Sequence, residues 1–145
     1  TKSLNGLTVK FWNVYGPEHD MEKSHVITDF IHKAKQGRIE MMTDGTEERQ
    51  FLHAEDCSKA LMILSEKYNE IDRDSNLHIT NFKWNTIMDV AEIIKDLIPC
   101  EIIPSSEIDS VQLNKRNEPD DYILSYWKPE ITLEEGIKKI INNTL

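Results

Sequence analysis

Cysteine is scarce in this chain, whose 145 residues include only Cys57 and Cys100. Two cysteines so far apart match neither the paired spacing of a zinc site nor a disulfide framework, so we expect no metal centre and a reducing, cytoplasmic location. The five histidines are scattered and add no ligand spacing. No apolar run approaches the roughly 18 residues that a membrane span needs, so we expect no membrane partner.

Positively charged residues are also few: the chain has 17 Lys and Arg residues against 26 Asp and Glu residues, which gives a net charge of −9. An acidic surface repels a phosphate backbone, so we expect no nucleic-acid polymer as a partner. The sequence contains no GxGxxG turn, P-loop, GxSxG elbow or CxxC pair. The residue types alone therefore identify no catalytic residue.

The apolar pattern predicts alternating strands and helices. Runs rich in β-branched and aromatic residues predict strands at 7–12, 39–42, 77–80 and 101–103, with a short apolar step at 51–52. Helical spacing predicts helices that begin near Val26, Glu55–Asp56, Asn85 or Thr86, and Thr132. We read Glu55–Asp56 as a helix cap. The order indicates an α/β fold in one domain over 1–145.

Arginine is the rarest of the charged residues, with four in the chain. Two of them, Arg49 and Arg116, fall in predicted loops. Because a guanidinium binds phosphate or carboxylate through two parallel hydrogen bonds, these arginines are candidates for an anion site in an otherwise acidic protein. From spacing alone, ion pairs with the many surface carboxylates are the favoured explanation.

Three ordered segments carry a resemblance: VKFWNVYGP at 9–17, SHVITDFI at 24–31, and TDGTEERQFLHAED at 43–56. A weaker match is Trp127-Lys128-Pro129 followed by Leu133-Glu134-Glu135-Gly136. Together they resemble the carboxy-terminal, substrate-binding half of the extended short-chain dehydrogenase/reductase family, the NAD-dependent nucleotide-sugar epimerases and dehydratases. The resemblance implies the last strand of a Rossmann-type sheet followed by a small α/β substrate-binding domain.

Two features of such enzymes are missing from this sequence: the glycine-rich turn for the NAD pyrophosphate and the Tyr-x-x-x-Lys acid–base pair. The resemblance thus implies that 1–145 is the nucleotide-sugar-binding half, without catalytic residues and inactive alone. The Rossmann half, in the same or a separate chain, would bind NAD or NADP, which this chain would not hold tightly. A homodimer is one option for the assembly.

The resemblance also assigns site residues, with a nucleoside-diphosphate sugar as the substrate. Substrate-binding positions would be Asn13, His25, Val26, Phe30, Arg49 and Arg116, and Trp12 and Val14 would lie beside the nicotinamide. Core packing is the alternative for Val26 and Phe30. Two departures from the family pattern are Lys10 in place of arginine and Gln50 in place of aspartate.

Three functions remain open from the sequence. The first is part of an enzyme, which could be an epimerase, dehydratase, decarboxylase or reductase, with the sugar and base undetermined. The second is a non-catalytic nucleotide-binding or protein-interaction module that retains the fold. The third is an unrelated α/β domain without a ligand.

Overall fold

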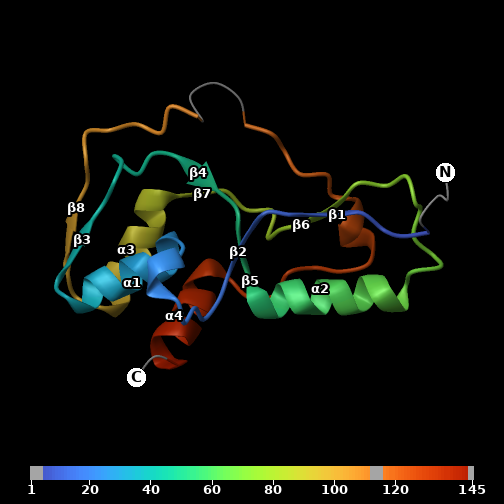
Figure 1. Cartoon of the computed structure of the whole chain (residues 1–145), viewed down its shortest axis with the longest axis horizontal. Coiled ribbons are helices and arrows are strands. Elements are labelled where there is room, and N and C mark those ends of the chain that lie inside the picture. The colour runs from blue at the N-terminus through green and yellow to red at the C-terminus, as the bar shows by residue number, and fades with distance from the viewer. Residues whose placement is uncertain (1–4, 112–115, 144–145) are drawn as a thin grey trace.

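The computed structural model describes residues 5–111 and 116–143. Its helices are α1 (Val26–Lys35), α2 (Ala54–Glu66), α3 (Ile87–Leu97) and α4 (Leu133–Asn143), with short 3₁₀ helices at Met21–Lys23 and Tyr122–Ser125. The strands are β1 (Val9–Phe11), β2 (Asn13–Tyr15), β3 (Arg38–Glu40), β4 (Glu48–Arg49), β5 (Phe51–His53), β6 (Leu77–Ile79), β7 (Asn85–Thr86) and β8 (Glu101–Ile103). Figure 1 shows α1, α3 and α4 grouped beside β3 and β8, and α2 running below β1 and β6, so the predicted α/β class is confirmed.

The strands form four separate pairs. The parallel pairs are β1 with β6, β2 with β5, and β3 with β8, while β4 and β7 are antiparallel. The strand predicted at 7–12 corresponds to β1, but the prediction missed β2, which follows it. The chain leaves β6 after Phe11 and joins β5 at Asn13, so the extended segment has two successive partners.

The helix ends follow their local chemistry. Thr86, one of the two predicted caps, begins α3 in a capping box, in which the side chains of Thr86 and Asp89 each accept from the backbone N–H of the other. Gly37 follows the end of α1 with a φ of 99°, as a helix stop does. The cap expected at Glu55–Asp56 is wrong, because the Nδ1 atom of His53 accepts the hydrogen bond from the backbone N–H of Glu55. Both acidic residues instead lie in the first turn of α2, where the helix dipole favours negative charge.

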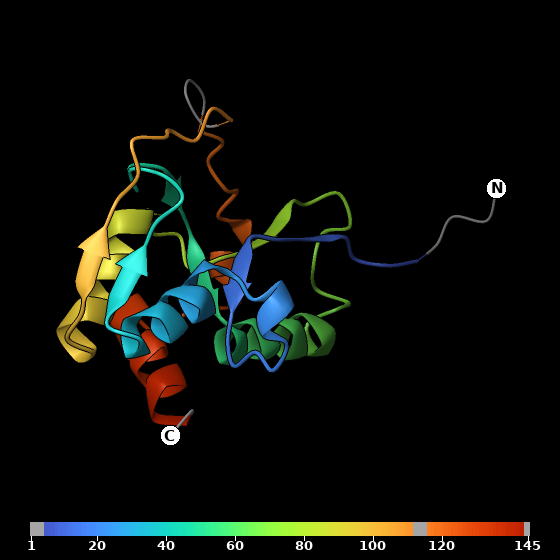
Figure 2. The same ribbon diagram turned by 60° about the vertical axis from the view of Figure 1, so that its left-hand side comes forward.

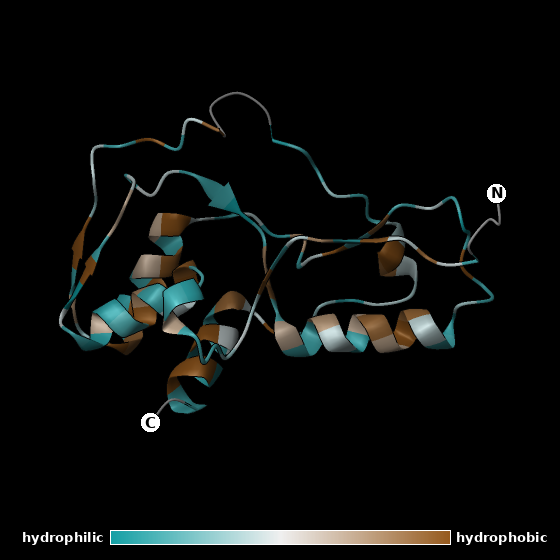
Figure 3. Cartoon of the chain, in the orientation of Figure 1, coloured by the Kyte–Doolittle hydropathy of each residue, from teal (hydrophilic) through white to brown (hydrophobic). Residues whose placement is uncertain are grey.

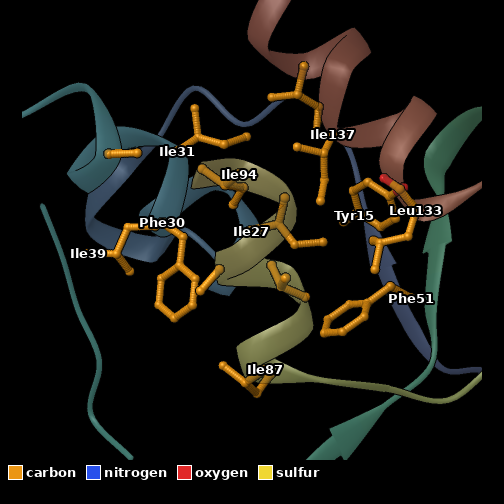
Figure 4. Close-up of a cluster of buried hydrophobic side chains, with 14 of the residues drawn as sticks. Tyr15, Ile27, Phe30, Ile31, Ile39, Phe51, Ile87, Ile94, Leu133 and Ile137 are labelled. Carbon is orange, nitrogen blue, oxygen red and sulfur yellow. The ribbon is translucent and has the colours of Figure 1, made fainter. Parts of the chain in front are cut away.

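Two hydrophobic clusters fill the molecule. The first cluster joins α1, α3 and α4, and Figure 4 shows its side chains converging between these helices. The second cluster lies between α2, β6 and the 3₁₀ helix at Tyr122–Ser125. Figure 3 shows hydrophobic and hydrophilic residues alternating along the helices, which is the pattern of helices with one buried face.

The β2–β5 pair separates the two clusters. Phe51 belongs to the first cluster and Leu52 to the second, because consecutive side chains of a strand point to opposite faces. Val14, the register partner of Leu52, packs on the second cluster, whereas Tyr15 is in the first. Figure 2 shows the first group of helices on one side of these strands and α2 on the other. This arrangement places Asn13 at the start of the separating pair.

Candidate functional site

Asn13 lies at the point where the extended chain changes partner. The parallel strands β1 and β6 end beside it, and β2 begins with it. A crevice beyond the carboxyl ends of diverging parallel strands is the usual ligand site of an α/β sheet. Asn13 is exposed and lines three neighbouring hollows of about 480, 550 and 890 Å³. Its side-chain amide can donate and accept hydrogen bonds in any of them.

The 550 Å³ hollow, which we call the methionine hollow, is lined by apolar side chains together with polar and charged ones, among them Asp29, Lys33 and Glu47. Val26 and Phe30 reach it from α1, and Met41 and Met42 from the segment after β3. Phe30 is also a member of the first cluster, so it packs in the core and lines the hollow as well. Flexible thioethers with an aromatic ring suit a flat, apolar ligand group.

The 890 Å³ hollow, which we call the tryptophan hollow, is more polar. Trp12, Trp84 and His78 contribute rings to its lining, and Lys10, Arg49, Arg116 and Glu118 contribute charge. The Trp12 and Trp84 rings meet edge to face, with centroids 5.7 Å apart. Aromatic rings with a few convergent polar groups are typical of a binding site for a small molecule.

Arg49 stands between these two hollows and lines both. It lies on β4, where its Nη1 donates to the carbonyl of Glu48 at 2.9 Å. Its Nη2 donates to Oδ2 of Asp109 at 2.7 Å. The hydrogen bond from Arg49 is the main cause that holds the pKa of the Asp109 carboxyl below its usual range. The ion pair expected as the alternative for Arg49 is thus present, at a residue that also lines the candidate site.

Arg116 lies across the tryptophan hollow from Arg49. Its Nη1 donates to Oε2 of Glu48 at 2.8 Å, and its Nε donates to Oε1 of Glu118 at 2.9 Å. These hydrogen bonds raise the pKa of Arg116, with Glu48 as the first cause. The guanidinium also lies 4.5 Å from the centroid of the Trp84 ring, which fixes its plane.

His25 lies at the amino-terminal end of α1, where a phosphate is expected. Its backbone N–H donates to Oε2 of Glu18 at 2.9 Å, and its Nδ1 pairs with Oε1 of the same carboxylate. Although partial burial opposes the shift, the hydrogen bonds from His25 lower the pKa of Glu18. A carboxylate therefore already neutralises this helix end, and a phosphate there must displace it.

The 480 Å³ hollow contains the two residues expected beside the nicotinamide. Trp12 and Val14 both line it, together with Phe11 and Tyr15. Val14 is half-buried against the second cluster, so it offers only part of its side chain. Trp12 also lines the tryptophan hollow.

Sequence reasoning missed three residues of the tryptophan hollow and its rim: His78, Trp84 and Asp109. His78 lies on β6 beside Lys10 in the parallel register, and Trp84 follows the bend after β6. The available signal was their position at the carboxyl end of a predicted strand. Nothing in the sequence pairs Asp109 with Arg49, which lies 60 residues away.

Comparison with known proteins gives a match to the model of the NAD dependent epimerase/dehydratase family over residues 1–80. The match covers more than half of the chain. The chain belongs to this family. Its extended short-chain dehydrogenase/reductase resemblance is thereby confirmed.

Curated relatives in the epimerase/dehydratase family are longer than this chain. GDP-L-fucose synthase of Sinorhizobium fredii is 28% identical over 138 residues, covering 88% of this chain and 43% of that protein. UDP-glucuronic acid decarboxylase 5 of Arabidopsis thaliana is 30% identical over 141 residues, covering 88% and 38%. The chain thus spans about two fifths of the length of these relatives.

Solved structures of the epimerase/dehydratase family share the fold. UDP-glucose 4-epimerase from Thermotoga maritima, solved with UDP-glucose, superposes with a TM-score of 0.74 at 17% identity, covering 94% of this chain and 44% of that one. RMD from Pseudomonas aeruginosa, complexed with NADPH, gives 0.78 at 18% identity, covering 99% and 49%. The similarity confirms the expected fold of a partial Rossmann-type sheet with a small α/β domain.

Metal-binding clusters and membrane-spanning helices are two further features that bear on function. Among residues 5–111 and 116–143, no group of three or more His, Cys, Asp or Glu residues is placed to hold a metal ion. Within the same ranges, no helix has the length and apolar character needed to cross a membrane.

Proposed function

We propose that residues 1–145 form the nucleotide-sugar-binding half of an NAD- or NADP-dependent enzyme that modifies the sugar of a nucleoside-diphosphate sugar. The position of Arg49 carries the proposal. A strong anion-binding side chain lines both the methionine hollow, which offers Val26, Phe30 and two methionines, and the more polar tryptophan hollow. A nucleoside-diphosphate sugar has the same order of parts, with a flat base, a central dianion and a hydroxylated ring.

Each part of this ligand has a place. The base enters the methionine hollow against Val26 and Phe30, and the diphosphate lies on Arg49 with Arg116 opposite. Asn13 lines both hollows and hydrogen-bonds the diphosphate or the sugar. His25 contributes at the end of α1 once Glu18 is displaced. The sugar then occupies the tryptophan hollow.

Binding requires the arginines to exchange partners. Arg49 leaves Asp109, and Arg116 leaves Glu48 or Glu118. These ion pairs are partly exposed, so each is worth only about 0–1 kcal/mol. Charge-assisted bonds to phosphate contribute roughly 1.5–3 kcal/mol each, which favours the exchange.

The chain fits one end of a nicotinamide cofactor. The 480 Å³ hollow offers Phe11, Trp12 and Val14 as an apolar wall suited to a flat ring. The sequence contains no glycine-rich turn for the pyrophosphate, so the Rossmann half of the enzyme must hold the rest of the cofactor. A bound nicotinamide would supply hydride transfer to or from the sugar. This chain positions the sugar for that transfer.

Titration of the complete enzyme with UDP-, GDP- and dTDP-sugars tests the proposal. We expect Arg49→Ala to weaken the affinity by about 10- to 100-fold, because each 1.4 kcal/mol corresponds to a factor of ten. Arg49→Lys keeps the charge without the planar fork and recovers part of the affinity.

Arg38→Ala is the matched control. Arg38 is an exposed arginine paired with Glu40, and it lines none of the three hollows around Asn13. Unchanged affinity in Arg49→Ala, with the fold intact by circular dichroism, contradicts the proposal. Tight binding without turnover in the presence of cofactor favours the non-catalytic module instead.

A further inference from the structure

The tryptophan hollow contains a continuous row of rings that begins at one of the arginines. The Arg116 guanidinium lies on Trp84, Trp84 meets Trp12 edge to face, and Trp12 meets His78 with centroids 6.0 Å apart. The row runs from the Arg116 guanidinium to the His78 imidazole, which has Lys10 as its partner on the neighbouring strand. A row of rings that starts at a guanidinium suits a ligand with a phosphate next to a sugar ring.

Backbone geometry builds this row. Lys10 and His78 are register partners on parallel strands, and Trp12 lies two residues beyond Lys10, so its side chain returns to the same face. After β6 the backbone bends at Phe82, whose φ of 58° is in the left-handed region. Because a bulky residue rarely adopts this conformation, the bend that precedes Trp84 is maintained against a local cost.

The hydrogen bonds to His78 fix its proton. The indole N–H of Trp12 donates to Nδ1 of His78 at 3.3 Å, and the backbone N–H of Asp120 donates to the same atom at 3.3 Å. An atom that accepts two hydrogen bonds carries no proton of its own, so the ring proton is on Nε2. The residue is therefore a neutral imidazole with a donor at Nε2.

The charges around His78 agree with a neutral ring. Burial is the first cause that lowers the pKa of His78, and Lys10 on the neighbouring strand lowers it further. Asp120, just before the 3₁₀ helix that packs on β6, acts in the opposite direction and does not reverse the shift.

We propose that Trp12 and His78 form the sugar subsite of this protein, with Trp84 positioning Arg116 at the phosphate end. The C–H face of a pyranose packs on the Trp12 indole, and a sugar hydroxyl accepts a hydrogen bond from Nε2 of His78. This inference rests on the proposed function and adds residues that recognise the sugar itself. The sugar subsite is compatible with a nicotinamide near Trp12, because hydride transfer requires contact between the nicotinamide ring and the carbon of the sugar that is oxidised or reduced.

The test separates sugar recognition from nucleotide recognition. Affinities of the complete enzyme for a nucleoside-diphosphate sugar and for the same nucleoside diphosphate are measured at pH 8 by calorimetry. We expect His78→Phe to weaken binding of the sugar nucleotide about tenfold, since a hydrogen bond and its packing are lost, and to leave the nucleoside diphosphate unchanged. His78→Gln, which keeps an acceptor and a donor, restores part of the loss.

His32→Phe serves as the matched control, because His32 is exposed on α1 and its ring pairs with the side chain of Gln36, the residue that caps the end of this helix. Equal weakening of both ligands by His78→Phe, or no weakening of either, overturns the subsite. If wild-type enzyme binds neither ligand, the proposed function itself fails and the subsite with it. The two failures are thereby distinguished.

A second readout does not depend on turnover. Protonation of His78 places a proton on Nδ1, which then faces two N–H donors. Sugar-nucleotide affinity of the wild type should fall as the pH drops through the pKa of His78, which lies below the ordinary value of 6.5. In His78→Phe this part of the pH profile is absent. An identical profile in both proteins overturns the subsite.

Discussion

Gly136 on α4 offers a direct test of how the first cluster is packed. A Cβ atom at this position would lie 1.9 Å from the Tyr15 hydroxyl oxygen, 2.8 Å from its Cζ and 3.1 Å from Cδ2 of His53. Tyr15 is buried and its hydroxyl is directed at the carbonyl of Leu133 on the same helix. Neither the ring nor the helix can move away without disturbing the cluster shown in Figure 4.

Two effects oppose each other in Gly136→Ala. Alanine is the better helix former by about 1 kcal/mol. Overpacking of a filled core costs about 1–3 kcal/mol, and an overlap of more than an ångström belongs at the upper end of that range. We therefore expect a net loss of about 2 kcal/mol in the free energy of unfolding. Helix propensity alone predicts a gain of about 1 kcal/mol in the free energy of unfolding, so it and overpacking predict changes of opposite sign.

Urea unfolding followed by circular dichroism measures this difference. The Tyr15→Phe variant removes the oxygen that makes the shortest contact and leaves Cζ, so the double variant Tyr15→Phe/Gly136→Ala should recover part of the loss. The coupling between the two sites then isolates their contact. Gly6→Ala is the control, because a Cβ there has no atom within 4 Å. Wild-type or higher stability of Gly136→Ala would refute the reasoning.

Two further predictions concern Arg49 and α3. Asp109→Asn keeps the carbonyl oxygen that accepts from Val111 and removes the charge that pairs with Arg49, so affinity for sugar nucleotides should rise about two- to fivefold in calorimetric titration. Unchanged or weaker binding contradicts the partner exchange. Thr86→Ala deletes the side chain that accepts from the Asp89 N–H and should lower the unfolding free energy by about 1 kcal/mol in urea, whereas a loss below a few tenths would show that the cap is dispensable.

Much of the fold follows from sequence patterns that are local. The helices were predictable because their apolar spacing agrees with a cap or a stop, as Thr86 and Gly37 illustrate. The partner change after Trp12 was not predictable, because nothing in the apolar run at 7–12 indicates that a second strand follows it with a different partner. The β4–β7 pair has two residues in each strand, too few to show alternation.

The candidate site was predictable only in part. The resemblance identified Asn13, Arg49 and Arg116, and all three line the tryptophan hollow. The roles of His78 and Trp84 depend on a strand register and on the left-handed bend at Phe82, which are tertiary features. The roles proposed for all these residues in binding stay predictions until the titrations are done.

The position of the β2–β5 pair has a consequence for how the protein unfolds. Neighbouring residues of β5 belong to opposite hydrophobic clusters, so both clusters share the β2–β5 pair. Neither cluster can therefore unfold without disrupting the packing of the other. Amide protons of the pair then exchange with solvent only through global opening, and both clusters share one unfolding transition. We therefore expect the backbone of Asn13, at the end of this pair, to be among the slowly exchanging parts of the chain.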